Sequence, residues 1–269
     1  MTQIKQLSLA LHAELLSVAN ALADVARPIA LNYFRQFRQD VENKLDGGFD
    51  PVTVADRGIE QAMREVLAVR RAKDGIYGEE FGQSYGVSEF TWVLDPIDGT
   101  RAYISGLPTW GVLIAVGGDE GPQIGIIDQP FIGERFIGSS SGAEWIRGHE
   151  RVQLNVRNCA SLAEATLFTT FPEVGTTAER LAFERVRDQV KLVRYGVDCY
   201  AYGLIAAGQA DLVVEAGLKA YDVQGPIAVI QAAGGIVTNW QGGPAHNGGT
   251  VLAAGDPRIH TAALKLLNA

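Results

Sequence analysis

A change of strand pattern near residue 155 constrains the fold of this 269-residue chain more than any other feature. From about residue 91 to residue 155, strand-like runs such as FTWVLD, TWGVLIAVGG and PQIGIIDQP are separated only by turn residues. Such short connections predict antiparallel neighbours in one sheet. Beyond residue 155, strand-like and helical patterns alternate, which indicates α/β structure. We therefore predict an N-terminal α+β half (1–155) and a C-terminal α/β half (156–269), joined as one compact unit without a linker.

Two helical patterns precede the sheet. Apolar residues recur at helical spacing from Leu7 to about Phe37, and Pro28 is expected to kink this helix or to split it in two. A second pattern begins at Thr53, a candidate N-cap, with Asp56 in its first turn. The polar segment between them, ENKLDGGFDPVT, predicts a loop or a hairpin.

Composition and charge exclude several classes of protein. The net charge is −8 and no basic run is present, so nucleic-acid binding is not expected. The two cysteines, Cys159 and Cys199, do not form a disulfide framework, which favours a reducing cytoplasm. The N-terminal segment lacks a signal-peptide pattern, and no run approaches the roughly 18 apolar residues that span a bilayer. We expect a cytoplasmic protein without a membrane partner.

The segment LDPIDGT places two acids three residues apart, Asp95 and Asp98, where the strand pattern FTWVLD ends. Pro96 between them fixes φ, removes a backbone donor and suits the first turn of a helix. Carboxylates this close repel each other unless a cation lies between them, and Mg²⁺ prefers oxygen ligands. Taken alone, the segment is equally compatible with a structural turn, because Asp-Pro and Asp-Gly are common turn formers.

The same segment offers further groups for a cation and a phosphate. The Ile97 carbonyl could supply another oxygen ligand. Gly99 and Thr100 would open a helix, whose free N–H groups favour an anion.

Other acids stand at the ends of predicted elements. Glu79 and Glu80 end the strand pattern YGEE, and Asp222 stands where a helix begins in AYDVQGP. Each position has a structural alternative, because Asp222 could be an N-cap and Asp56 could be an acid of a helix's first turn.

The order and spacing of GEE, LDPIDGT and YDVQGPIAVIQAAGG resemble the inositol-monophosphatase-like family of Mg²⁺-dependent, lithium-sensitive phosphatases. DPVTVADRGIE is similar to the first motif of that family, so the resemblance runs from about residue 44 to residue 235. It implies the layered α-β-α-β-α sandwich of the inositol monophosphatase and fructose-1,6-bisphosphatase type, and a homodimer. Tyr221 replaces the usual tryptophan before Asp222, and Pro226 is expected in the first turn of the helix that follows.

The resemblance also implies roles for individual residues. Two or three Mg²⁺ ions would be held by Glu79, Asp95, the Ile97 carbonyl, Asp98 and Asp222. Thr100 and Asp56 would orient and deprotonate the attacking water, with Glu80 nearby, and the backbone groups of Gly99 and Thr100 would hold the phosphate. Metal ions of this kind make a covalent nucleophile unnecessary.

Two segments, TRAYISGLP and DCYAYGLIAAG, look like the histidinol-phosphate phosphatase subgroup of the family. Histidinol carries an amine and an imidazole, so the carboxylates of Asp198 and Glu215 would suit it as substrate-binding groups. Lys44 is predicted as a further substrate-binding residue. Asp198 could instead cap the helix that begins CYAYGLI, and Glu215 could bind inositol hydroxyls. The alternatives are an inositol monophosphatase or broad sugar-phosphate phosphatase, and a non-catalytic regulatory or binding protein on the same fold.

Overall fold

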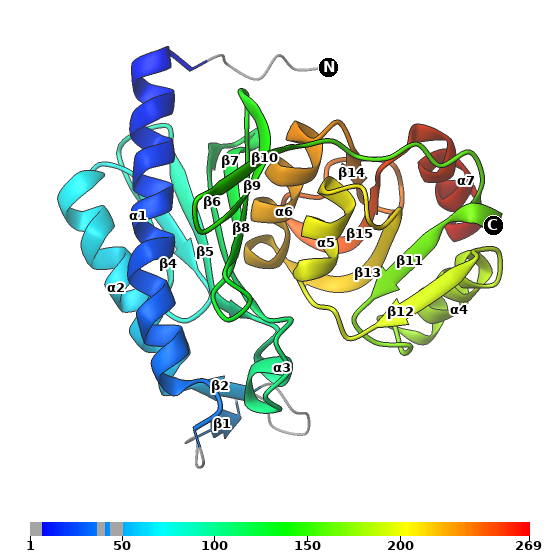
Figure 1. Cartoon of the computed structure of the whole chain (residues 1–269), viewed down its shortest axis with the longest axis horizontal. Helices are drawn as coiled ribbons and strands as arrows, with labels where there is room; N and C mark the ends of the chain where they lie inside the picture. The colour runs from blue at the N-terminus through cyan, green and yellow to red at the C-terminus, as the bar shows by residue number, and fades with distance from the viewer. Residues whose placement is uncertain (1–6, 37–40, 44–50) are drawn as a thin grey trace.

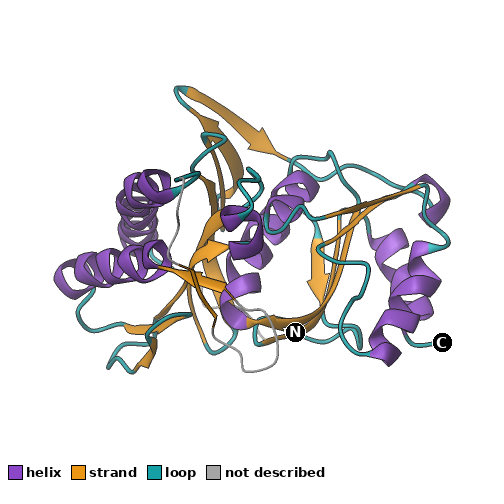
Figure 2. Cartoon of the chain, turned by 90° about the horizontal axis from the view of Figure 1, so that it is seen from below, coloured by secondary structure: helices purple, strands orange, loops and turns teal. Residues whose placement is uncertain are grey.

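The computed structural model describes residues 7–36, 41–43 and 51–269 as five stacked layers (Figures 1 and 2). Helices α1 (Leu9–Tyr33) and α2 (Val54–Arg70) cover the outer face of an eight-stranded sheet. Helices α5 (Tyr200–Ala206) and α6 (Ala220–Ala232) lie between this sheet and a five-stranded sheet. Helices α4 (Thr177–Arg187) and α7 (Pro257–Leu267) cover the far side. The predicted α-β-α-β-α sandwich is therefore confirmed.

The larger sheet has the strand order β10-β9-β8-β7-β6-β5-β3-β4, and all its neighbours pair antiparallel except β3 and β5. Its strands are β3 (Gly75–Gly78), β4 (Gly82–Ser84), β5 (Thr91–Asp98), β6 (Gly111–Gly118), β7 (Gly121–Gln129), β8 (Glu134–Ser139), β9 (Gly142–Arg147) and β10 (Glu150–Leu154). The antiparallel run predicted for residues 91–155 is confirmed.

The smaller sheet has the order β12-β11-β13-β15-β14, with parallel pairing on both sides of β11 and antiparallel pairing elsewhere. Its strands are β11 (Thr166–Thr169), β12 (Leu192–Tyr195), β13 (Leu212–Lys219), β14 (Ile236–Thr238) and β15 (Gly248–Ala254). Two short strands outside both sheets, β1 (Val41–Asn43) and β2 (Pro51–Thr53), pair antiparallel, as a hairpin requires. Short helical turns, α3 (Thr100–Ile104) and η1 (Leu162–Glu164), complete the described elements.

Helix α1 is continuous through Pro28, so the expected split of this segment does not occur. Among the described helices, α1 is long and apolar enough to cross a membrane by length and composition alone. Its apolar side chains, however, are part of the core that α2 and the larger sheet form, and Leu15, Val18 and Leu22 are fully buried there. The helix is therefore accounted for by packing within the protein.

Helix α6 packs closely on the larger sheet. A Cβ atom at Gly125 would lie 2.4 Å from the carbonyl oxygen of Gly225, and one at Gly138 would lie 2.4 Å from that of Ala228. Glycine at these two strand positions lets the helix backbone approach the sheet. Because α6 belongs to the C-terminal half and packs on the N-terminal sheet, the division at residue 155 stays a prediction.

Pro226 lies beyond the first turn of α6, contrary to our expectation, because the helix already begins at Ala220. A proline at this position removes the N–H that would otherwise bond to the carbonyl of Asp222, four residues earlier.

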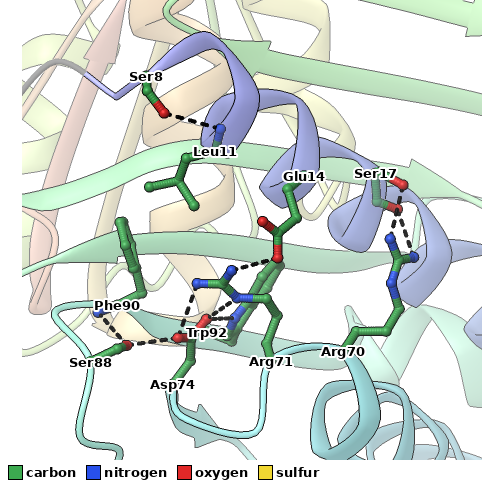
Figure 3. A network of polar contacts seen from close by, with 10 residues as sticks. All are labelled: Ser8, Leu11, Glu14, Ser17, Arg70, Arg71, Asp74, Ser88, Phe90 and Trp92. Carbon is green, nitrogen blue, oxygen red and sulfur yellow. Dashed lines mark hydrogen bonds and ion pairs between the residues drawn. The ribbon is translucent and has the colours of Figure 1, made fainter.

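A polar network ties α1, the end of α2 and the larger sheet together (Figure 3). The buried carboxylate of Asp74 accepts hydrogen bonds from Arg71 Nε at 2.6 Å, Ser88 Oγ at 2.7 Å and Trp92 Nε1 at 2.9 Å. Arg71 also binds Glu14 of α1, with 2.7 Å between Nη1 and Oε1.

We expect Asp74→Ala to lower the free energy of unfolding by about 3 kcal/mol, because it removes the acceptor of the buried Trp92 indole N–H and one of the two carboxylates that bind Arg71. Glu14→Ala removes the half-exposed acid of the same network and should cost less than about 1 kcal/mol. Urea unfolding of both variants measures this difference. Equal losses would contradict the role that we assign to Asp74.

Candidate metal and substrate site

A β-bulge brings Asp95 and Asp98 to the same side of β5. In a regular strand, residues three apart face opposite sides of the sheet. Here Asp95 pairs with Leu113 and Asp98 pairs with Gly111, so three steps along β5 match two steps along β6. The extra residue turns Asp98 back toward Asp95.

Pro96 lies within this bulge, and not in the first turn of a helix as the sequence led us to expect. A bulge tolerates proline because its backbone leaves the regular ladder of hydrogen bonds. The helix begins only at Thr100, after Gly99, whose φ of 80° favours glycine.

Asp222 completes the acid cluster from the start of α6. It is not the N-cap but the third residue of the helix, and its Oδ2 accepts the backbone N–H of Lys219 at 2.6 Å. This capping bond fixes the side chain at the end of the helix that packs on the sheet. Carboxylate oxygens of Asp95, Asp98 and Asp222 lie within 4.8 Å of one another.

The electrostatics of this cluster favour a cation. Burial, with added repulsion from Glu79, Asp98 and Asp222, raises the pKa of Asp95 well above its usual value. Burial and the charges of Asp198 and Asp222 likewise raise the pKa of Asp98. Within the described part of the chain, Asp95 Oδ1 is buried without a hydrogen-bond partner. Converging hard oxygen donors of this kind fit a divalent metal ion.

The cluster forms part of a cavity of about 330 Å³. Glu79 and Ile97, the other two residues predicted as metal ligands, also line it. Beyond the cluster, the lining includes Gly99, Thr100, Thr170, Phe171, Asp198 and Glu215. The structure therefore places the predicted metal, phosphate and substrate groups at one cavity, apart from Lys44, which lies outside the described residues.

The three predicted catalytic residues differ in whether they line the cavity. Thr100 lines the cavity, and its hydroxyl donates to the Ile97 carbonyl at 3.0 Å. Among the described residues, Asp56 and Glu80 are not part of the lining. Asp56 is buried and accepts hydrogen bonds from Thr53 N at 2.8 Å and Thr53 Oγ1 at 2.6 Å. Burial, with a contribution from the charge of Glu80, raises the pKa of Asp56 to about 6.

Asp198 does not cap α5, which has no side-chain cap. Its backbone has a φ of 49°, and its Oδ2 accepts a hydrogen bond from Thr109 Oγ1 at 2.8 Å. A Cβ atom at Gly99 would lie 2.8 Å from Asp198 Cγ, so the space beside Gly99 is filled by this carboxylate. The N–H at the start of α5, from Cys199, instead donates to Asp98 Oδ2 at 2.7 Å.

Glu215 is oriented by a second bulge. It pairs with Val251, whereas Leu218 pairs with Gly249, so three steps along β13 match two steps along β15. Glu215 Oε1 accepts hydrogen bonds from Thr170 N at 2.6 Å and Thr170 Oγ1 at 2.8 Å. Burial raises the pKa of Glu215 to about 7 despite these bonds.

Several residues at the cavity were not predicted from the sequence. Phe171 is 42% exposed there, and the guanidinium of Arg101 lies 5.0 Å from its ring centroid. Tyr202 also lines the cavity, and its buried hydroxyl has no hydrogen-bond partner in the described part of the structure. DCYAYG contains Tyr202, but the pattern indicated only an apolar helix face, and no motif marked Phe171.

The five-layer fold and the converging acids define a metal-dependent phosphatase of the sandwich type. The chain matches the inositol monophosphatase family over residues 11–269 and belongs to this family. It is 40% identical over 262 residues to the bifunctional phosphatase IMPL2, chloroplastic, of Arabidopsis thaliana, covering 93% of this chain and 74% of the relative.

Two further comparisons agree with this family membership. A histidinol-phosphatase of Mycobacterium tuberculosis is 32% identical over 260 residues, covering 94% of this chain and 98% of the relative. A solved structure of an inositol monophosphatase from Zymomonas mobilis superposes with a TM-score of 0.85 at 39% identity, covering 98% of this chain and all of that one. The chain is accordingly a phosphoric monoester hydrolase of this family.

The raised carboxyl pKa values predict how stability depends on pH. Between the unfolded values of Asp56 and Glu215, 3.8 and 4.5, and the folded values of about 6 and about 7, the folded protein binds more protons. The metal-free protein should therefore lose about 3 kcal/mol of stability as pH rises from about 5.5 to about 7.5. Excess Mg²⁺ should offset this loss, because its ligands must be ionised and the folded protein therefore binds Mg²⁺ more tightly as pH rises.

Urea unfolding at both pH values, with EDTA and with excess Mg²⁺, measures this effect. A metal-free protein that becomes steadily more stable up to about pH 7.5 would contradict the raised pKa values.

Proposed function

We propose that the protein is a Mg²⁺-dependent histidinol-phosphate phosphatase of histidine biosynthesis, which converts L-histidinol phosphate and water to L-histidinol and phosphate. The observation that carries this proposal is the position of Asp198 and Glu215, two carboxylates that line the same cavity as the acid cluster. Their negative charge suits a leaving group that carries an amine and an imidazole. Similarity to the histidinol-phosphatase of M. tuberculosis supports the same substrate.

In this proposal, Glu79, Asp95, the Ile97 carbonyl, Asp98 and Asp222 hold two or three Mg²⁺ ions. When bound, these ions activate a water molecule and stabilise the leaving oxygen. The N–H groups of Gly99 and Thr100 hold the phosphate at the start of α3.

The water is oriented by Thr100, whose hydroxyl proton points to the Ile97 carbonyl and leaves its lone pairs free to accept. For the proton acceptor we propose Asp56, because a carboxyl with a pKa of about 6 is largely ionised at neutral pH and still basic enough. Since Asp56 lies outside the cavity lining of the described residues, the proton would have to reach it through an intervening group. Glu80 acts through its charge, which helps to raise that pKa.

The second candidate is an inositol monophosphatase or broad sugar-phosphate phosphatase. Glu215 could accept hydrogen bonds from a pair of hydroxyls, and the similar structure from Z. mobilis is that of an inositol monophosphatase. In this reading Asp198 would have no cation to bind, and its carboxylate would face a neutral leaving group.

Phosphate release from L-histidinol phosphate and from inositol 1-phosphate, each with Mg²⁺, separates the two candidates. We expect kcat/KM to be at least about tenfold higher for L-histidinol phosphate, because one charge-assisted hydrogen bond contributes roughly 1.5–3 kcal/mol. Comparable or greater efficiency on the inositol ester would exclude the histidinol assignment.

We further propose that the enzyme acts as a cytoplasmic homodimer on a small phosphorylated metabolite. Both cysteines are free and buried, which suits a reducing compartment. Sedimentation analysis would test the dimer, and a monomer at micromolar concentration would exclude it.

A further inference from the structure

The turn between β3 and β4 has to hold Glu79 against Asp95, although it is only a few residues long. On its N-terminal side, the turn is tied to β5, because the backbone N–H of Glu79 donates to the Leu94 carbonyl at 3.2 Å. This bond lies one residue before Asp95, and Glu79 and Asp95 line the same cavity. The antiparallel pairing of β3 with β4 closes the turn at Gly78 and Gly82, and the backbone N–H groups of Glu80 and Phe81 within the turn are bound by another group.

The second anchor is Glu60, a fully buried acid of α2. Glu60 Oε2 accepts the backbone N–H of Glu80 at 2.7 Å, and Glu60 Oε1 accepts that of Phe81 at 3.3 Å. The carboxylate thus binds the two N–H groups that follow Glu79. The metal-ligand candidate Glu79 therefore lies between one backbone hydrogen bond to β5 and two hydrogen bonds from the turn to the Glu60 side chain of α2.

Arg64, one helical turn further along α2, completes the clamp. Its Nε donates to Glu60 Oε1 at 2.8 Å, its Nη2 to the Gly82 carbonyl at 2.5 Å, and its Nη1 to Ser84 Oγ at 3.1 Å. The Glu60–Arg64 pair therefore binds the turn and the strand β4 that follows it.

Gly78 makes room for this clamp. A Cβ atom at Gly78 would lie 2.0 Å from Glu60 Oε1, so the carboxylate occupies the place of a side chain directly before Glu79. A buried ion pair contributes little net stability compared with apolar packing. Its position against the ligand-bearing turn indicates that it serves to orient the turn.

We propose that Glu60 is a positioning residue that holds Glu79 in the metal site. This inference rests on the proposed metal site but not on the identity of the phosphate ester. Partners of this kind, which orient a ligand without touching the metal, change metal affinity by roughly 10- to 100-fold when they are removed.

The test is direct binding of Mn²⁺, followed by electron paramagnetic resonance of the free ion, with Glu60→Gln, Glu60→Asp and a control. Glu60→Gln has only one acceptor oxygen, and we expect Mn²⁺ to bind about tenfold more weakly or worse. Glu60→Asp keeps the charge but shortens the reach, and should weaken binding about threefold or more. Glu65→Gln removes the same charge from an exposed position on the same helix and should change nothing.

Turnover of a phosphate ester adds a second readout. In Glu60→Gln, the Mg²⁺ concentration for half-maximal activity should rise, while kcat at saturating Mg²⁺ stays within about threefold of wild type. The proposal would be overturned if Glu60→Gln had a lower melting temperature but bound Mn²⁺ with unchanged affinity. If Glu60→Gln does not fold, the same result in Glu60→Asp would overturn it. If Asp95→Asn binds Mn²⁺ with the affinity of the wild-type protein, the assignment of the metal site is itself wrong.

Discussion

Asp95→Asn is expected to lower metal-dependent phosphate release by at least about 100-fold while the protein stays folded. Loss of an outer partner already weakens a metal site by roughly 10- to 100-fold, so loss of a ligand should do more. Asp95 is buried at the bulge of β5, and its charge is repelled by Glu79, Asp98 and Asp222. The neutral amide removes this repulsion, so the metal-free variant should be more stable than wild type at neutral pH.

A second buried aspartate of the same sheet provides the control. Asp128 Oδ1 accepts hydrogen bonds from Arg27 Nη2 and Arg135 Nε, both at 2.7 Å, and it lies outside the cavity lining of the described residues. Asp128→Asn should therefore lose about 3 kcal/mol of stability and keep its activity while folded. Activity of Asp95→Asn within tenfold of wild type, or a loss of stability like that of Asp128→Asn, would argue against the metal-site interpretation.

Asp198→Asn should lower kcat/KM for L-histidinol phosphate by about 10- to 100-fold, the loss expected when a charge-assisted hydrogen bond becomes a neutral one. Asparagine tolerates the φ of 49° at this position and can still accept the Thr109 hydroxyl. The substitution thus removes the charge with little change in shape. Asp198→Ala would confuse the result, because alanine is strained at this φ.

The control is the same variant acting on inositol 1-phosphate, whose hydroxyls are neutral. Its turnover should stay within about threefold of wild type, since a neutral ester gains nothing from the charge of Asp198. Equal losses on both esters would remove Asp198 from substrate choice. If the variant needs the same Mg²⁺ concentration for half-maximal activity as the wild-type protein in both assays, its metal site is intact.

Several elements of the fold could be predicted from the sequence because they have a local signal, whereas short elements such as β4 and η1 were not predicted. The capping residue Thr53 marked the start of α2, and β-branched and aromatic residues marked β5. The bulge at Pro96 could not be predicted, because it is defined by the pairing of β5 with β6, which depends on residues at Leu113 and Gly111. The sequence favoured a helical turn there for the same proline.

The acids of the proposed metal site were predicted from the motifs, but their surroundings were not. Glu60 reads as an ordinary helix residue, and its bonds to Glu80 and Phe81 exist only once α2 packs against the turn after β3. The contact between Asp198 and Gly99 joins residues that are 99 positions apart, so no local sequence pattern predicts it. Such contacts are properties of the tertiary structure.

We propose that the cluster of Asp95, Asp98 and Asp222 holds the metal on which phosphate release depends. The most direct measurement is phosphate release from L-histidinol phosphate by EDTA-treated protein as Mg²⁺ is added back. We expect no turnover without metal and full recovery with Mg²⁺, with a lower apparent affinity for Mg²⁺ at acidic pH. Turnover that is unaffected by EDTA would contradict the claim, as would Mg²⁺-dependent turnover that survives in Asp95→Asn.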